Sequence, residues 1–105
     1  MADALSIQQV DRQVKGLLRQ IDSESLVKEE KQSIQDLKQL LNEVRLEIRD
    51  YDFAQTRDEQ LKHGKLARKQ LRKLVDVILA LSSLFGPADI AQLTAQLEQL
   101  SETLT

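Results

Sequence analysis

The sequence contains no cysteine and no tryptophan, and it has one histidine, one proline and three glycines. Without cysteine, the chain forms no disulfide and offers neither a thiolate metal ligand nor a cysteine nucleophile. A catalytic site that needs an imidazole would have to use His63, and Gly16, Gly64 and Gly86 are too far apart for a phosphate-binding loop. We therefore predict no catalytic residue and no cofactor, and we expect that the protein is not an enzyme.

The single histidine is a weak candidate for a metal ligand. Glu59 lies four residues before His63 on the same helical face, and Asp58 lies nearby in the sequence. Helical di-metal proteins, however, take a Glu-x-x-His motif from each of two helices, and that motif does not occur in this chain. With Lys62 and Lys65 beside it, His63 is predicted to be a plain surface residue, and no metal site is predicted.

Long apolar runs are also missing. The longest apolar stretch, residues 74–85, is interrupted by Asp76, Ser82 and Ser83 and is too short to span a bilayer. Residues 1–6 lack the basic start and following apolar run of a secretory signal. We expect a cytoplasmic protein that does not bind membranes.

What the chain does contain is a helix-forming composition. Hydrophobic residues make up 41% of its 105 residues and charged residues 30%, which is too apolar for intrinsic disorder. Leu, Gln, Glu, Lys, Arg and Ala predominate, and these side chains lose little conformational entropy in a helix. No segment alternates apolar and polar residues as a strand would. The composition predicts an all-α fold with a single domain over residues 1–105.

Apolar residues recur at alternating spacings of three and four, which places each set on one side of a helix. The four stripes are Ile7, Val10, Val14, Leu17 and Ile21; Ile34, Leu37, Leu41, Val44, Ile48 and Tyr51; Leu71, Leu74, Ile78, Leu81 and Phe85; and Ile90, Leu93, Leu97, Leu100 and Leu104. The third stripe is offset by two residues from the second, so the helix must end or slip between them. We place this break near residues 52–56, and one continuous bent helix is the alternative.

Capping residues mark the same boundaries. Three pairs fit a capping box, in which a side chain at the helix start and another three residues later each accept a free backbone N–H. These pairs are Ser6 with Gln9, Thr56 with Glu59, and Asp89 with Gln92. Gly86-Pro87 predicts the end of the third helix, with Gly86 in a left-handed conformation and Pro87 opening the fourth helix.

The stripes and short connections predict an antiparallel bundle of about four helices with heptad-type packing. Two long central helices form a hairpin that turns near Ala54, and two shorter outer helices pack at its open end. In this hairpin, Gly64 lies near the edge of its stripe, where a missing side chain would permit close helix approach.

The closed end of the hairpin is expected to be only half covered. Val44, Ile48, Tyr51 and Phe53 offer an apolar surface there, and the third helix returns few large side chains against it. Because helical stability comes mainly from packing an apolar face, a second copy of the chain is the simplest cover. The sequence therefore predicts a homodimer with these four residues at the interface.

Residues 61–73 hold six of the fifteen Lys and Arg residues and none of the seventeen acidic residues. Helical spacing places these cations opposite the third stripe, as an outward surface that we call the basic ridge. It consists of Lys62, Lys65, Arg68, Lys69, Arg72 and Lys73. Three interpretations are open: a solvated face, a site for an acidic protein, or a site for nucleic acid.

Each interpretation has its own support. In the predicted hairpin, Glu47, Glu43 and Asp36 fall opposite Leu61, Lys65 and Arg72, which favours a solvated and ion-paired face. The ridge has no aromatic residue for base stacking, which argues against nucleic acid. The leading hypothesis is a non-enzymatic protein–protein interaction module, such as an adaptor, an assembly subunit or a small chaperone-like factor. The alternative is a regulatory protein that contacts nucleic acid through residues 62–73.

Overall fold

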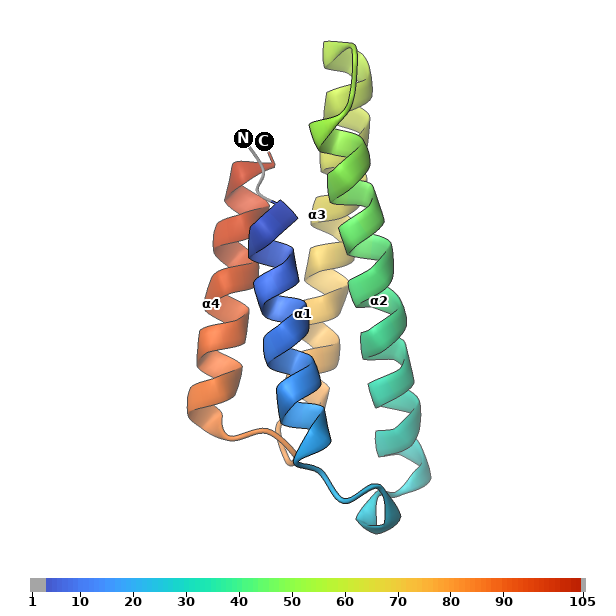
Figure 1. Cartoon of the computed structure of the whole chain (residues 1–105), viewed down its shortest axis with the longest axis vertical. Helices are drawn as coiled ribbons and strands as arrows, with labels where there is room; N and C mark the ends of the chain where they lie inside the picture. Colours follow the sequence, from blue (N-terminus) through green and yellow to red (C-terminus); the bar gives the residue numbers. More distant parts are fainter. Residues whose placement is uncertain (1–3, 105) are drawn as a thin grey trace.

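The computed structural model describes residues 4–104, and side chains from residue 7 onward, as an all-α bundle without β-strands (Figure 1). Its elements are α1 (Ala4–Arg19), the short 3-10 helix η1 (Ser23–Ser25), α2 (Lys28–Asp52), α3 (Arg57–Ala80) and α4 (Pro87–Thr103). Consecutive α-helices run antiparallel, and α1 also packs against α4, so the four helices close into a ring. The predicted fold class and the predicted helix order are confirmed.

The two long helices, α2 and α3, form the predicted central hairpin. Its tip projects beyond the start of α1 and the end of α4, which lie at the same end of the bundle (Figure 1). The molecule measures 48 × 23 × 18 Å along its principal axes. Since α1 contacts α2 and α4, it lies diagonally across the ring from α3. The outward surfaces of α1 and α3 therefore face opposite directions.

The break between the long helices lies where the phase shift predicts it. α2 ends at Asp52, and α3 begins at Arg57 with Thr56 as its N-cap. Thr56 Oγ1 accepts the backbone N–H of Glu59 at 3.1 Å, and Glu59 Oε2 accepts the backbone N–H of Gln55 at 3.4 Å. These two bonds satisfy donors that the first turn leaves free. The alternative of one continuous helix is wrong.

Other helix ends differ from the sequence prediction. α1 already begins at Ala4, so Ser6 lies inside the helix and is not its N-cap. Gly86 is the N-cap of α4 with φ −65° and ψ 152°, so it is not in the left-handed conformation. α3 ends earlier, at Ala80, and the chain then turns with the N–H groups of Leu84 and Phe85 both donated to the carbonyl of Leu81. Gly86 is therefore not needed to end α3, because this turn has already done so.

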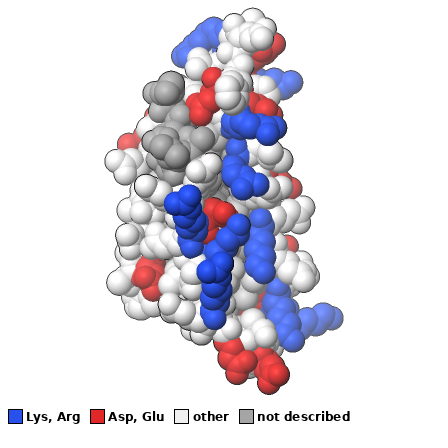
Figure 2. All heavy atoms as spheres, in the orientation of Figure 1, with Lys and Arg blue, Asp and Glu red and all other residues white. Residues whose placement is uncertain are grey.

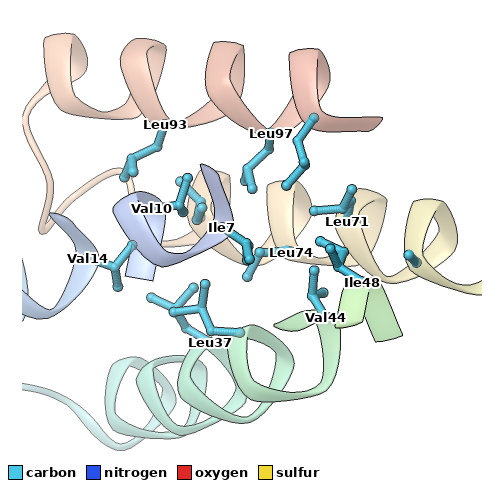
Figure 3. Close-up of a cluster of buried hydrophobic side chains, with 14 of the residues drawn as sticks. Ile7, Val10, Val14, Leu37, Val44, Ile48, Leu71, Leu74, Leu93 and Leu97 are labelled. Atoms are coloured by element: carbon cyan, nitrogen blue, oxygen red, sulfur yellow. The ribbon is translucent and has the colours of Figure 1, made fainter. Parts of the chain in front are cut away.

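The four stripes meet in one hydrophobic core, shown from within in Figure 3. Among the described residues, no polar or charged residue is buried. The buried side chains are Ile7, Val10, Val14, Leu37, Leu41, Val44, Ile48, Tyr51, Ala67, Leu71, Leu74, Ile78, Leu81, Phe85, Leu93, Leu97, Leu100 and Leu104. The spacing of apolar residues thus correctly predicts which side of each helix faces inward.

The closed end of the hairpin is better covered than predicted. Val44 and Ile48 are 0% exposed and Tyr51 is 5% exposed within the single chain. The end of α4 reaches this region: a Cβ on Gly64 would lie 2.6 Å from the carbonyl oxygen of Leu104 and 3.0 Å from Cε2 of Tyr51. The missing side chain of Gly64 permits this close approach, as predicted. Placing Val44, Ile48 and Tyr51 at an exposed dimer surface is therefore wrong.

Candidate functional site

The basic ridge lies on the outward side of α3, away from the stripe that begins at Leu71. Five of its six side chains are exposed, and Arg68 is half-buried beside α4. The helix brings the cations together because they recur every three or four residues, as the core residues do. The predicted clustering of these residues on one surface is therefore observed.

The predicted ion pairs across the hairpin are not observed. Among residues 7–104, no carboxylate lies within 4.0 Å of the charged nitrogens of any ridge residue. Asp36 and Glu43 instead line a groove of about 450 Å³ between α2 and α3, together with Lys73 and Asp76. Lys73 faces these acidic side chains, and Arg68 and Arg72 line a second groove with Asp76 and Glu98, all at distances beyond an ion pair.

The other ridge cations line an open hollow on the surface of α3. Its volume is about 630 Å³, and its walls are Lys62, Lys65, Leu66, Arg68, Lys69, Arg72 and Ser101. Leu66 is 42% exposed, so the hollow combines an apolar side chain with cations that form no ion pair among residues 7–104. A surface with one sign of charge and few counter-charges attracts anions and speeds their encounter. Binding of an anionic partner is the chemistry that this surface can support.

A second group of cations escaped the sequence analysis. Figure 2 shows Lys and Arg side chains over the face that carries α1 and α2, opposite the basic ridge. Lys31, Lys38 and Arg45 follow one another at intervals of seven residues on α2, and all three are exposed. That spacing was the available signal, but acidic residues lie between these cations in the sequence and obscure it. The positive and the negative side chains come to lie on different sides only when the segment folds into a helix.

A groove of about 230 Å³ runs between α1 and α2 on this face. Lys15, Lys38 and Arg45 line it, and Asp11 is the only acidic residue in its wall. Asp11 Oδ2 lies 2.9 Å from Lys15 Nζ, so one of the cations is neutralised by its neighbour on the same helix. Among residues 7–104, this groove therefore holds fewer cations without an ion pair than the hollow on the basic ridge does.

His63 is not the plain surface residue that the sequence predicts. Its Nδ1 lies 3.2 Å from Glu47 Oε1, and the two side chains are only 27% and 17% exposed. Asp50 completes a cluster in which one ligand-type atom from each residue lies within 4.8 Å of the other two. The predicted neighbour Glu59 is instead engaged in capping α3. The sequence analysis missed this cluster because it placed Leu61, and not His63, opposite Glu47 in the hairpin.

The described residues offer charged surfaces for binding. The hollows are open grooves between helices whose walls carry charged side chains. Recognition through charge is the activity that such surfaces favour.

Comparison with protein-family models, curated proteins and solved structures finds no match for this chain. Within residues 4–104, none of the helices combines the length and the apolar character that crossing a membrane requires.

Proposed function

We propose that this protein is a non-enzymatic protein–protein interaction module whose basic ridge binds an acidic segment of a partner protein. The observation that carries the proposal is the lack of ion pairs: among residues 7–104, no carboxylate lies within 4.0 Å of the charged nitrogens of a ridge residue. A solvated face is the competing interpretation, and the ion pairs predicted to flank it are not formed among residues 7–104. An adaptor or a subunit of a larger assembly would use the ridge in this way, and a cytoplasmic location is part of the same proposal.

The mixture of charge and apolar surface favours a protein as the partner. Leu66 lies among the ridge cations in the same hollow and is 42% exposed, so it can contact an apolar side chain between acidic ones. Nucleic acid fits less well, because the ridge has no aromatic residue and the whole chain has a net charge of −2. A regulatory protein that binds nucleic acid through residues 62–73 remains the alternative.

A charge reversal on the ridge tests the proposal. We expect the triple variant Lys65→Glu, Lys69→Glu and Arg72→Glu to bind a fluorescein-labelled, glutamate-rich peptide containing a few leucines at least about tenfold more weakly. Three attractive contacts of up to about 1 kcal/mol each would become repulsive. Fluorescence anisotropy at physiological ionic strength measures the affinity. Thermal unfolding should change little, because all three side chains are exposed.

The matched control reverses the same amount of charge on the opposite face, in the variant Lys31→Glu, Lys38→Glu and Arg45→Glu. This control should retain most of the peptide affinity, because its three residues lie on the opposite face and would not contact a peptide bound to the ridge. Equal losses of peptide affinity in both variants would mean that overall net charge causes the effect, and would reject the ridge as the binding site. A labelled DNA duplex is titrated in parallel. Binding of DNA that falls steeply with salt and disappears in the ridge variant would favour the nucleic-acid alternative.

The homodimer stays a prediction, but with a smaller interface. Of the four residues predicted there, Phe53 is the one that is exposed, at 77%, and it lies at the hairpin tip after the end of α2. We expect light scattering at micromolar concentration to report a dimer, and Phe53→Ser to shift it toward the monomer by removing apolar contact area. A monomer at every concentration of the unchanged protein would reject the dimer.

A further inference from the structure

We propose that Glu47, Asp50 and His63 form a binding site for a divalent transition-metal ion of the zinc type, which joins α2 to α3 near the tip of the hairpin. This site is independent of the basic ridge and of the interaction proposed for it. It uses the only histidine of the chain together with two carboxylates from the facing helix.

The backbone places the three ligands before any metal binds. Glu47 and Asp50 are three residues apart on α2, so their side chains lie on the same side of that helix. His63 faces them from α3, and one ligand-type atom from each residue lies within 4.8 Å of the others. Ile48 and Tyr51 on α2 and Gly64 on α3 are buried directly beside them. The packed core thus fixes the two helix segments that carry the ligands.

The distances are compatible with tetrahedral coordination. Zinc binds nitrogen and oxygen ligands at about 2.0–2.1 Å, so two ligand atoms of a tetrahedral site lie about 3.3 Å apart. The observed separation of His63 Nδ1 and Glu47 Oε1 is 3.2 Å. This distance is equally that of a hydrogen bond, and Asp50, as a third ligand-type group beside the pair, distinguishes a metal site from a simple hydrogen bond. Small side-chain rotations would bring all three atoms to one ion.

The donor set selects the class of metal. Imidazole suits zinc and similar transition metals, whereas magnesium and calcium prefer all-oxygen sites. The two carboxylates would balance the double positive charge of the ion. Three protein ligands leave one tetrahedral position for water or for a group from another molecule. The partial burial of Glu47 and His63 strengthens this attraction relative to a fully exposed site.

Nearby cations oppose binding only weakly. Arg49 Nε lies 4.0 Å from Asp50 Oδ1, but both side chains are about half exposed, and such pairs contribute little. Lys62 and Lys65 flank His63 in the sequence, and both are exposed to solvent. A bound ion would displace the Arg49 contact and the hydrogen bond between His63 and Glu47. It would replace them with a link across the hairpin.

The experiment titrates untagged full-length protein with zinc chloride by calorimetry, and follows the imidazole signals of His63 by NMR. Because the chain has one histidine and no cysteine, these signals report a single site. We expect one zinc ion per chain, a shift of the His63 resonances on binding, and no displacement by excess magnesium. Zinc at 100 times the Kd should raise the Tm by on the order of 10 °C.

Three variants and one control decide the assignment. We expect His63→Asn, Glu47→Gln and Asp50→Asn each to weaken zinc binding at least about tenfold. Losing a residue that only hydrogen-bonds to a metal ligand already lowers the affinity by that factor. Asp58→Asn is the matched control: it removes one exposed carboxylate near the same end of α3, outside the cluster. It should bind zinc as the unchanged protein does. Metal-free thermal unfolding of each variant checks that it is folded.

Several results would overturn the assignment. These are no saturable zinc binding below roughly 100 µM, unchanged affinity in His63→Asn, or a loss in Asp58→Asn equal to that in Asp50→Asn. Asp50 is exposed, so its variant keeps the test decisive even if replacing the half-buried Glu47 or His63 disturbs folding. Displacement of zinc by excess magnesium would show binding to carboxylates alone and would reject the role of His63.

Discussion

Replacing Leu74 with Ala should lower the free energy of unfolding by about 2–5 kcal/mol, the usual cost of truncating a fully buried leucine. Leu74 is 0% exposed and lies on α3 among side chains from the other helices (Figure 3). The variant loses both the transfer of the removed atoms from water and the contacts around the cavity left behind. For a domain whose total stability is about 5–15 kcal/mol, this is a large fraction.

Urea denaturation followed by circular dichroism measures the effect, and Leu79→Ala is its matched control. Leu79 lies on the same helix, five residues later, and is 50% exposed. The same chemical change there should alter the free energy of unfolding by less than about 1 kcal/mol. Comparable losses at both positions would mean that α3 is rotated about its axis relative to the structure described above. The other predicted core residues, Leu37, Leu41, Ile78, Leu93 and Leu97, should behave as Leu74 does.

Spacing along the chain predicts the inward sides of the helices well, because burial is the strongest constraint on an amphipathic helix. All stripe residues of α2 except the partly buried Ile34, and all of those within α3, are buried. The two-residue phase shift correctly requires a break between the two helices. Local signals at helix ends were less reliable. Ser6 and Gly86 both have the right residue type for the predicted cap, yet α1 starts two residues before Ser6, and Gly86 caps the next helix.

The basic ridge was predictable because its members are neighbours in the sequence. Features that depend on how two helices pair were not. Residue spacing fixes which side of a helix faces inward, but it does not fix how far one helix slides along its neighbour. The predicted register paired Glu47 with Leu61, whereas the structure places its side chain beside His63. The cluster of Glu47, Asp50 and His63 was therefore invisible from the sequence.

The same limit explains the error about the closed end of the hairpin. Its apolar residues appeared uncovered because the third helix offers Gly64 and Ala67 there instead of large side chains. In the structure, both positions are buried, and the end of α4 approaches Gly64 so closely that no larger residue would fit. The sequence analysis took these small residues as gaps in the core, whereas they mark the place where α4 packs closely against α3.

Gly64→Ala should therefore lower the free energy of unfolding, because overpacking usually costs about 1–3 kcal/mol. The added methyl group would lie 2.6 Å from the carbonyl oxygen of Leu104 and 3.0 Å from Cε2 of Tyr51, both closer than a normal contact. The carbonyl belongs to the backbone at the end of α4, so relief requires moving that helix end away from α3. This cost should exceed the gain of about 1 kcal/mol that Ala brings to a helix interior.

Gly16→Ala is the control, and it should have the opposite sign. Gly16 also lies inside a helix, but a Cβ there would meet nothing within 4 Å outside its own helix backbone. With no steric cost, the better helix propensity of Ala should raise the free energy of unfolding by up to about 1 kcal/mol. In thermal unfolding, one variant should melt below the unchanged protein and the other above it. If Gly64→Ala also melts higher, α4 does not approach α3 this closely, and Val44, Ile48 and Tyr51 return as candidates for a dimer interface.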